Sequence, residues 1–525
     1  MIILTAVLVL ACQMGGDGSL EFNGRQVDPP LSATEPLELS LEDALVTAFA
    51  NNLSLATTRL DTEAAMDGFR AAWGDFDTVF FVDASRSEDN QPPSPINFVG
   101  GVNLGINPAS EFDIFNLRTG VRGKLTTGTT WQLDVGHTEF KRTISGVPGH
   151  SDNFTADWRL SLTHPLLRDG SDDYAMSGVA LAAHDVRIAA LSGEDTANDI
   201  LQGVIQSYWN LVFAIHDAAT RERSVELANE LLEITQRKFD QGLQNRIDVI
   251  NAEAELANRR QELLTASNSL EQSSDDLFEQ VFAPGTLDGW QGKLIPVTDY
   301  THLPSEVRSV DTAVAIALAN RPDILNAKLS VERAEIEVQR AENQGQSRLD
   351  VTGTVGINSL NTNTGKTYQT LGDRRNSLTS VVVAYELSLG NRSAGYALRR
   401  RRIEWERSRV ALRDVELKAI SEVRQEARNV ALQRERVVAT AETRRLRSEV
   451  YEGEKRRLEN DLSTPFEVRE DQRDLLLAID DETRARLDLA TALTSYKAAQ
   501  GDLLSLIGYV RQDADLPLDQ APPAP

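Results

Sequence analysis

A long-range duplication constrains this sequence more than any other feature. The stretch KFDQGLQNRIDVINAEAEL at 238–256 has the same pattern as RLENDLSTPFEVREDQRDL at 457–475, an offset of 219 residues. A second pair of segments, 39–60 and 308–329, aligns at an offset of 269. The chain thus reads as two copies of one unit. Because 269 and 219 differ by 50, the first copy carries about fifty extra residues before its long helix.

Each copy contains a very long helical pattern. Residues 173–241 and 391–460 contain no proline, and at 1.5 Å per residue each would extend about 100 Å. Apolar residues recur at coiled-coil spacing, as at Leu489, Leu493 and Tyr496. We expect each copy to form a helical hairpin. The other predicted helices are shorter and cover residues 40–73, 247–281, 310–344 and 466–508.

The turns of both hairpins carry helix-capping signals. In the second copy Thr464 is positioned to cap, Pro465 occupies the first helical position, and Glu467 follows three residues after the cap. In the first copy Asn245 and Asp248 take the corresponding positions. The pattern predicts two sharp reversals between antiparallel helices.

Between the helices the apolar period changes from about 3.6 to 2. Phe154, Ala156 and Trp158, for example, alternate with Thr155 and Asp157. This alternation is typical of a transmembrane β-barrel wall, and equally of a half-exposed sheet in a soluble domain. Six strands are predicted, near residues 76–86, 113–125, 129–143, 153–165, 348–360 and 377–389. We expect residues 88–112, rich in Pro, Asn and Gly, to form a loop.

Composition and the N-terminus narrow the function classes. The net charge of −25 disfavours nucleic-acid binding, which depends on basic residues. The apolar run that ends at Cys12, the single cysteine, is too short to span a bilayer and fits the core of a secretory signal. Val9-Leu10-Ala11-Cys12 resembles a lipobox, so Cys12 is either a lipidation site or a chance cysteine in a signal peptide.

The ordered set of these motifs resembles the TolC-type outer-membrane efflux proteins across about residues 38–509. The resemblance depends on the two helices at 39–60 and 308–329, the doubled hairpin turn, and PLLRDG at 165–170 before a long helix. It implies an α+β membrane protein: a homotrimer in which each chain contributes four strands to a twelve-stranded barrel in outer-membrane lipid, continued by an α-helical barrel in the periplasm. The extra strand pair around residues 125–131 would widen the barrel, extend above the membrane or pack elsewhere.

The resemblance implies the following domain plan. Residues 1–12 are a signal peptide with a lipobox, 13–37 a linker, 38–282 the first repeat, 283–309 an equatorial connector, 310–509 the second repeat and 510–525 a Pro-rich tail. The first repeat holds strands at about 76–165 and a helical hairpin at 173–281. The second holds strands at about 348–389 and a hairpin at 391–508.

The resemblance also implies roles for the hairpin turns. Glu467, Glu470 and Asp248 are candidates for an acidic ring at the tunnel mouth. Capping is the preferred interpretation of Glu467, whereas capping and gating are both open for Glu470. The turns would contact a periplasmic adaptor, or serve only as turns, through Gln241, Gly242, Leu243, Asn460, Asp461 and Leu462. Two residues that close the mouth in this family, a Tyr and an Arg, are replaced here by Leu458 and Ser463.

We find no pattern for catalysis, a cofactor or a metal. The six His are scattered, and Gly365-Lys366-Thr367 lacks the upstream glycine of a phosphate loop and is expected between strands. The predicted function is an outer-membrane exit duct of a tripartite efflux pump or type I secretion system, with a periplasmic adaptor and an inner-membrane pump as partners. The alternative is a periplasmic coiled-coil adaptor or scaffold.

Overall fold

The computed structural model describes residues 36–95, 106–145, 148–242, 244–282, 293–300, 307–372, 376–459, 462–509 and 511. The described residues fall into two compact units. The first contains residues up to Ala64, Val186–Ser330 and residues from Arg409 onward, and the second contains Ala65–Asp185 and Val331–Ser408. None of the helices that the structure describes has an apolar stretch long enough to cross a membrane.

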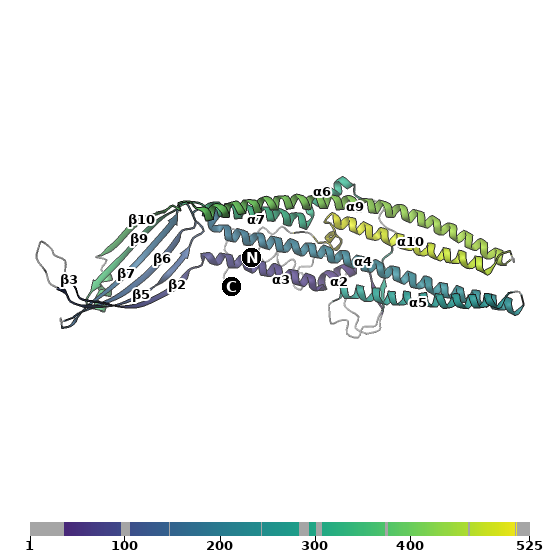
Figure 1. The fold of residues 1–525 in the computed structure, drawn as a ribbon, viewed down its shortest axis with the longest axis horizontal. Helices are drawn as coiled ribbons and strands as arrows, with labels where there is room; N and C mark the ends of the chain where they lie inside the picture. Colours follow the sequence, from purple (N-terminus) through teal and green to yellow (C-terminus); the bar gives the residue numbers. More distant parts are fainter. Residues whose placement is uncertain are drawn as a thin grey trace. The chain divides into compact units, whose positions relative to one another are not determined.

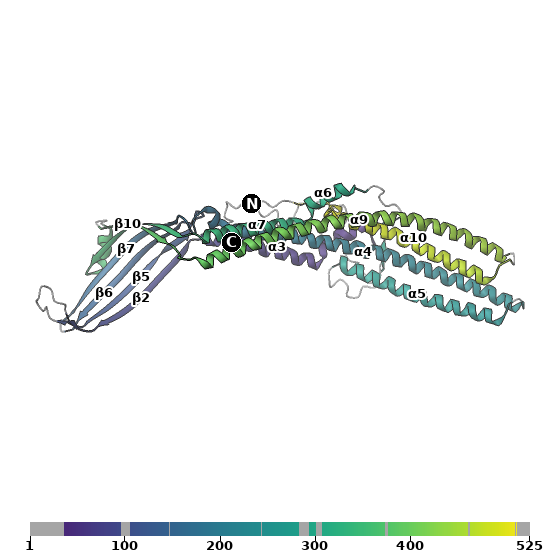
Figure 2. The ribbon, with the colours of Figure 1, turned by 45° about the horizontal axis from the view of Figure 1, so that its top comes forward.

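The two long helical hairpins are present. In the first copy α4 (Asp172–Asp240) is followed by α5 (Arg246–Val281), and in the second α9 (Arg392–Glu459) is followed by α10 (Pro465–Ala499). Within each pair the two helices lie side by side (Figures 1 and 2). The predicted bounds of both hairpins are confirmed to within two residues, except at the end of α10.

Three helix predictions need correction. The expected helix 40–73 is two helices, α2 (Leu41–Asn51) and α3 (Leu53–Ala72), and the expected helix 310–344 is also two, α6 (Val310–Asn320) and α7 (Pro322–Gln344). At the second break Pro322 lacks an N–H and forces its predecessor out of the α region. At the first, the Asn52 side chain accepts a hydrogen bond from the N–H of Ser54 at 2.9 Å and starts a new helix. The last helix ends at Ala499, and a short 3₁₀ turn, η2 (Leu504–Ile507), follows.

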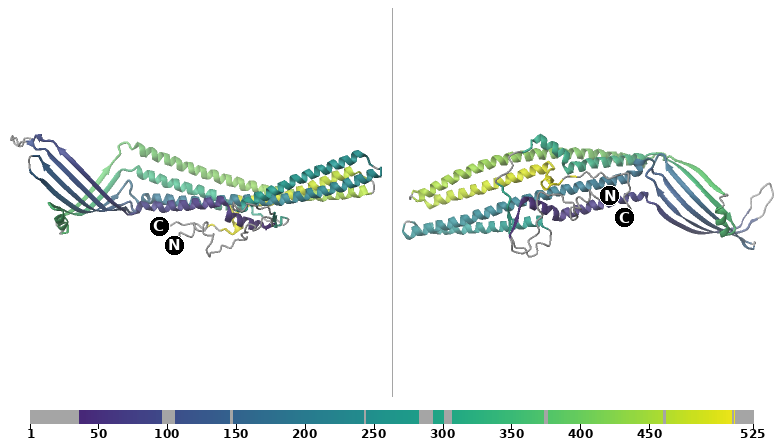
Figure 3. Two further views of the ribbon diagram at one scale, coloured as in Figure 1. Left: turned by 90° about the horizontal axis from the view of Figure 1, so that it is seen from below. Right: turned by 180° about the vertical axis from the view of Figure 1, so that it is seen from behind.

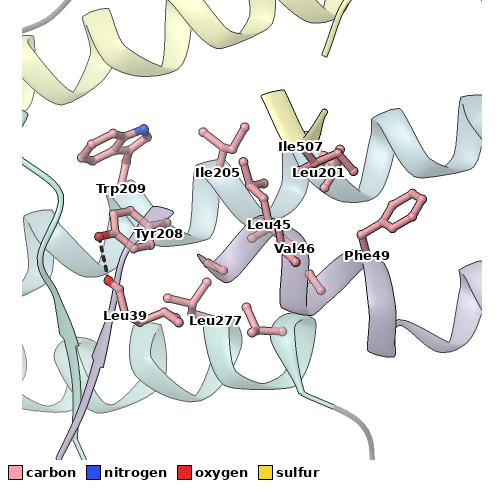
Figure 4. Close-up of a cluster of buried hydrophobic side chains, with 14 of the residues drawn as sticks. Leu39, Leu45, Val46, Phe49, Leu201, Ile205, Tyr208, Trp209, Leu277 and Ile507 are labelled. Atoms are coloured by element: carbon pink, nitrogen blue, oxygen red, sulfur yellow. Dashed lines mark hydrogen bonds between the residues drawn. The ribbon is translucent and has the colours of Figure 1, made fainter. Parts of the chain in front are cut away.

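The first unit contains the main hydrophobic core. Its apolar side chains come from α2, α4 and α5, with contributions from α10 and η2 (Figure 4). A parallel pair of short strands, β1 (Leu37–Leu39) and β8 (Leu294–Pro296), joins the N-terminal part of the first copy to the connector. Tyr208, fully buried on α4, fixes this pair, because its hydroxyl donates to the carbonyl of Leu39 at 3.0 Å (Figure 4). The same hydroxyl accepts a hydrogen bond from the N–H of Thr298 at 3.1 Å.

The second unit contains one six-stranded antiparallel sheet in the order β10-β9-β7-β6-β5-β2 (Figures 1 and 3). All six predicted strands are confirmed. The extra pair of the first copy, β5 and β6, lies inside this sheet between β2 and β7. The strands are β2 (Val79–Gln91), β5 (Ser110–Lys124), β6 (Thr130–Ile144), β7 (His150–Pro165), β9 (Arg348–Asn361) and β10 (Ser377–Glu386).

Structure is present within residues 88–112, which were expected to be a loop, and in the stretch between β9 and β10. Within 88–112, β2 continues to Gln91, the short strands β3 (Ser94–Pro95) and β4 (Ile106–Asn107) pair, and β5 starts at Ser110. Gly365-Lys366-Thr367 lies in the first half of a helix, α8 (Thr364–Gly372), which packs on β7 and β9. The Thr367 hydroxyl of this helix donates to the carbonyl of Phe154 on β7 at 3.2 Å. The remaining described element is a single turn, η1 (Trp73–Phe76), between α3 and β2.

Candidate functional site: the hairpin turns and the sheet

The turn between α9 and α10 is held by Glu467. Its carboxylate accepts hydrogen bonds from the Thr464 N–H and the Ser463 hydroxyl, both at 2.9 Å. In return the N–H of Glu467 donates to Thr464 Oγ1 at 3.3 Å, which completes the predicted capping box. These bonds favour the charged form and lower the pKa of Glu467, the backbone bond contributing most. The preferred interpretation of Glu467 as a capping residue is therefore confirmed.

The turn between α4 and α5 repeats this chemistry. The Asp248 carboxylate accepts a hydrogen bond from the N–H of Asn245 at 3.1 Å, again within a capping box. Gly242 has a φ of 74°, a left-handed conformation that glycine adopts without steric cost, and its N–H donates to the carbonyl of Phe239 at 2.8 Å. Both carboxylates that the sequence places three residues after a cap act as predicted.

A pocket of about 340 Å³ lies between the two turns. It brings Asp248 of the first hairpin close to Thr464 and Phe466 of the second. Arg469 also lines it, with its guanidinium 4.8 Å from the ring centre of Phe466. The pocket is lined by Leu231, Thr235, Gln244, Asp248, Asn251, Ala252, Thr464, Phe466 and Arg469.

Glu470 differs from Glu467 in its surroundings. Its side chain is about half exposed, and its carboxylate lies 3.5 Å from Arg473 Nη2. It takes no part in the capping box of α10, which uses Thr464 and Glu467. Of the two acidic residues that the sequence singles out on this helix, Glu470 is therefore the one that the capping interpretation does not explain.

Ser463, which replaces the expected arginine, has a local role. Its hydroxyl lies within hydrogen-bond distance of the carboxylates of Glu454 and Glu467, so it links the last turns of α9 to the first turn of α10. Leu462, a predicted adaptor contact, is exposed, and its N–H donates to the carbonyl of Arg457 at 2.8 Å. Cys12, Leu243, Asn460 and Asp461 lie outside the described residues.

Ion pairs between helices were not identified from the sequence. Arg221 on α4 contacts Asp480 on α10 at 2.9 Å and Glu262 on α5 at 3.7 Å. Burial raises the pKa of Asp480 to about 6, against the opposing effect of Arg221. Arg447 on α9 lies 3.0 Å from Asp474 on α10. In the sequence these residues look like any charged helix surface, so no local signal distinguishes them.

The sheet has one apolar and one polar face. Phe80, Val121, Leu133, Leu160 and Val355 lie opposite one another on successive strands, so they share the apolar face. Much of this face is uncovered in the single chain: Phe80 is 68% exposed and Val355 52%. Val381, Val383 and Tyr385 on β10 are more than three-fifths exposed. Exposed apolar surface of this extent marks a face that meets lipid or protein.

The polar face carries a compact charged cluster. Arg118 on β5 forms an ion pair with Asp134 on β6 and lies 3.6 Å from Asp157 on β7. Arg159 lies 2.7 Å from Asp157 and 3.9 Å from Asp134. We call these four residues, two of each sign, the sheet cluster. Gly120 and Gly136 make room for it, since a Cβ at either position would approach atoms of Asp134 or Asp157 within 3 Å.

Comparisons with known proteins agree with this architecture. The family model for outer membrane efflux proteins matches residues 167–280 and 313–502, more than half of the chain. No curated protein sequence matches.

Several solved structures share the fold at low sequence identity. The chain is 15% identical to the CmeC outer membrane channel of Campylobacter jejuni, over 88% of this chain and 86% of that one, with a TM-score of 0.61. It is 16% identical to the outer membrane protein VceC of Vibrio cholerae, over 90% and 97% of the two chains, with a TM-score of 0.61. The open state of the MtrE outer membrane channel of Neisseria gonorrhoeae is also 16% identical, over 88% and 89%, with a TM-score of 0.57.

The length of the family match decides between the two functions that the sequence left open. It covers the long helices and hairpin turns of both copies, together with β9 and β10 of the sheet. A periplasmic adaptor or scaffold is not favoured by it. The chain belongs to the outer membrane efflux protein family.

Proposed function

We propose that three copies of this chain form an outer-membrane exit duct. The sheets close edge to edge into a barrel in the outer membrane, and the helical hairpins continue its bore into the periplasm. The observation that carries the proposal is the sheet: its apolar face is uncovered, its polar face holds the sheet cluster, and both edge strands, β2 and β10, lack a neighbour on one side within the described residues.

A stripe on α9 supports assembly with further copies. Ile403, Val410 and Leu417 recur every seven residues and are each more than three-fifths exposed in the single chain. A heptad spacing of apolar residues is the pattern by which a helix packs against a neighbouring helix. In a trimer this stripe lies against the next protomer.

The test measures the mass of the purified assembly and the ionic current that it conducts. We expect the detergent-purified protein to run as a trimer by light scattering and to conduct ions across a planar bilayer. Leu417→Glu places a charge in the stripe and is expected to reduce the trimer fraction at least tenfold, whereas Leu417→Met, of similar volume and polarity, keeps it. A monomeric wild-type protein that passes no current contradicts the proposal.

The hairpin turns are proposed to meet a periplasmic adaptor that links the duct to an inner-membrane pump. The residues concerned are Gln241, Gly242, Leu243, Asn460, Asp461 and Leu462. This is supported by the exposure of Gln241, Gly242 and Leu462 at the ends of the hairpins. Site-specific photo-crosslinking from Leu462 in whole cells tests it, and an adduct with an outer-membrane protein in place of an adaptor contradicts it.

Glu470, with Asp248 and Glu467 nearby, is proposed to form an acidic ring at the tunnel mouth. Three protomers would bring three copies of the half-exposed Glu470 together, and carboxylate rings attract cations at a constriction. Glu470→Gln is expected to weaken block by multivalent cations in single-channel recordings. Glu467→Gln is expected to have a smaller effect, because the Glu467 carboxylate is held in the capping box of α10, and equal effects of both variants would contradict a special role for Glu470.

A further inference from the structure

The base of the sheet, which is the end at which its strands continue into helices, has more strands than helices. Four helices join it directly: α3 leads through η1 into β2, β7 leads into α4, α7 leads into β9, and β10 leads into α9 (Figure 1). The hairpin β5–β6 lies between β2 and β7 and has no helix of its own. Its turn is tight, since the N–H of Leu125 donates to the carbonyl of Thr129 at 2.8 Å and Gly128 adopts a φ of 80°.

The hairpin matches its neighbours on both faces of the sheet. On the apolar face Leu133 of β6 lies opposite Leu160 of β7, and Val121 of β5 lies opposite Phe80 of β2. On the polar face the hairpin supplies Arg118 and Asp134 to the sheet cluster. A hairpin that packed elsewhere would have no need of two faces that continue those of β2 and β7.

The sheet cluster also fixes the hairpin in place. The Asp134 side chain is only 3% exposed although it lies on an open sheet, because Arg118 and Arg159 cover it. Withdrawal of the hairpin would separate Asp134 from Arg159 and would break the full ladders that join β5 to β2 and β6 to β7. Asp134 would keep Arg118, which lies on the same hairpin, but a buried carboxylate that loses one of its two cations is destabilised.

We propose that the assembled duct has an eighteen-stranded wall, six strands from each of three chains, in place of the twelve expected from the family resemblance. This inference rests on the proposed trimer, and it specifies the number of strands in the barrel wall and the diameter of the bore. At a strand spacing of about 4.8 Å and a tilt of about 40°, eighteen strands enclose a backbone diameter of roughly 36 Å and twelve strands roughly 24 Å.

The helices at the base of the sheet support the larger number. Four helices from each of three chains, spaced about 9 Å apart, need a ring of roughly 110 Å in circumference. Eighteen strands of ordinary tilt have about the same circumference, whereas twelve have about two-thirds of it. With the added hairpin, a wall of ordinary tilt therefore has about the same circumference as the ring of helices that it joins.

The wider wall has a consequence for the substrate class. The sheet cluster contributes no net charge to the polar face, because its two Arg offset its two Asp. The sheet cluster therefore favours neither sign of charge, and the wider wall admits bulkier hydrated solutes than a twelve-stranded wall of equal tilt.

Polymer exclusion tests the bore. Polyethylene glycols of graded size are added to the extracellular side of a bilayer, and the largest that lowers the current is recorded. Deletion of residues 110–144 removes β5 and β6 together, so the remaining strands keep their alternating direction. We expect the deletion to lower the hydrodynamic diameter at exclusion to about two-thirds of the wild-type value. Equal cut-offs would overturn the proposal, whereas a wild-type protein without current would contradict the proposed function itself.

Cysteine pairs provide a test that does not require the deletion variant to fold. Leu133→Cys with Leu160→Cys joins β6 to β7, and we expect this disulfide to form in current-carrying trimers. Phe80→Cys with Leu160→Cys is the matched pair: β5 and β6 separate these residues by about 14 Å, beyond the reach of a disulfide. A disulfide in the second pair and not in the first would show that β2 pairs directly with β7, which overturns the proposal.

Discussion

The two copies of the duplicated sequence use different means to stabilise the junction at which their first helices meet the long hairpin. Leu39 and Arg308 are equivalent at the offset of 269, and in each copy a tyrosine hydroxyl donates to the carbonyl of that residue at 3.0 Å. In the first copy the tyrosine is Tyr208 on the long helix α4, and in the second it is Tyr496 on the shorter helix α10. The same contact is therefore made from opposite helices of the hairpin.

The residues that surround the two tyrosine contacts differ between the copies more than the contacts themselves do. Around Tyr208, β8 and η2 add Leu294, Leu504 and Ile507 to the core of the first copy. Half of the buried residues in the cluster around Tyr496 are alanines, among them Ala313, Ala317 and Ala492. The junction of the second copy depends instead on Arg321, which contacts Asp323 at 2.9 Å and Glu422 at 2.8 Å. A shared sequence pattern thus specifies the helices and leaves their stabilisation to segments outside the pattern.

The largest expected effect compares the hydrophobic cores of the two copies. Leu45 on α2 is 2% exposed, and its equivalent Val314 on α6 is only partly buried. We expect Leu45→Ala to lower the free energy of unfolding by about 2–5 kcal/mol. Val314→Ala should cost about 1 kcal/mol, because less apolar surface is lost. Guanidinium titration in detergent measures both, and equal losses would show that another protomer buries the second copy to the same extent.

The second largest expected effect compares the loss of stability at the junctions of the two copies. Arg321 and Asn52 occupy equivalent positions, one held by ion pairs and the other acting as a cap. Arg321→Met leaves Asp323 and Glu422 without their cation and should cost about 2–3 kcal/mol. Asn52→Ala should cost about 1 kcal/mol. The same titration compares them, and a larger loss at Asn52 would reverse the distinction drawn between the copies.

A pH dependence follows from Asp480, whose equivalent in the first copy is the non-titrating Gln261. Burial raises the pKa of Asp480 to about 6 from an unfolded value of about 3.9, so the folded chain holds this proton more tightly. Its contribution to stability is full below about pH 4 and is lost as the pH rises through 6. We expect the free energy of unfolding to fall by about 1–2 kcal/mol across this range and Asp480→Asn to remove that fall.

Asp488→Asn is the control for the pH experiment, because Asp488 also pairs with arginines of α9 and α10 but is more exposed. Wild-type and Asp480→Asn proteins with parallel pH profiles would contradict the assignment. In the Asp480→Asn variant Arg221 keeps Asp217 and Glu262 as partners, so no cation is left unpaired.

The smallest expected effect compares the two tyrosines. Tyr208→Phe leaves the Thr298 N–H and the Leu39 carbonyl without this partner in a fully buried site and should cost about 1–2 kcal/mol. Tyr496→Phe removes a single bond, to the carbonyl of Arg308, and should cost about 0.5–1 kcal/mol. Thermal unfolding followed by circular dichroism resolves the difference, and a costlier loss at Tyr496 would show that β1 and β8 do not depend on Tyr208.

Much of the fold was predictable because its signals are local. The period of two identified all six strands, and the caps at Thr464 and Asn245 identified both turns. The breaks at Asn52 and Arg321 were missed because the helical pattern continues across them, although Pro322 was a signal for the second. The pairing of β1 with β8 and the ion pair of Arg221 with Asp480 join residues more than 250 positions apart, and nothing in either segment alone specifies such a partner.

The core around Tyr208 also constrains how the chain is made. Leu39 near its beginning and Ile507 near its end belong to one buried cluster. A nascent chain therefore lacks part of this core until residue 507 has been synthesised, and contacts of such high sequence separation form slowly.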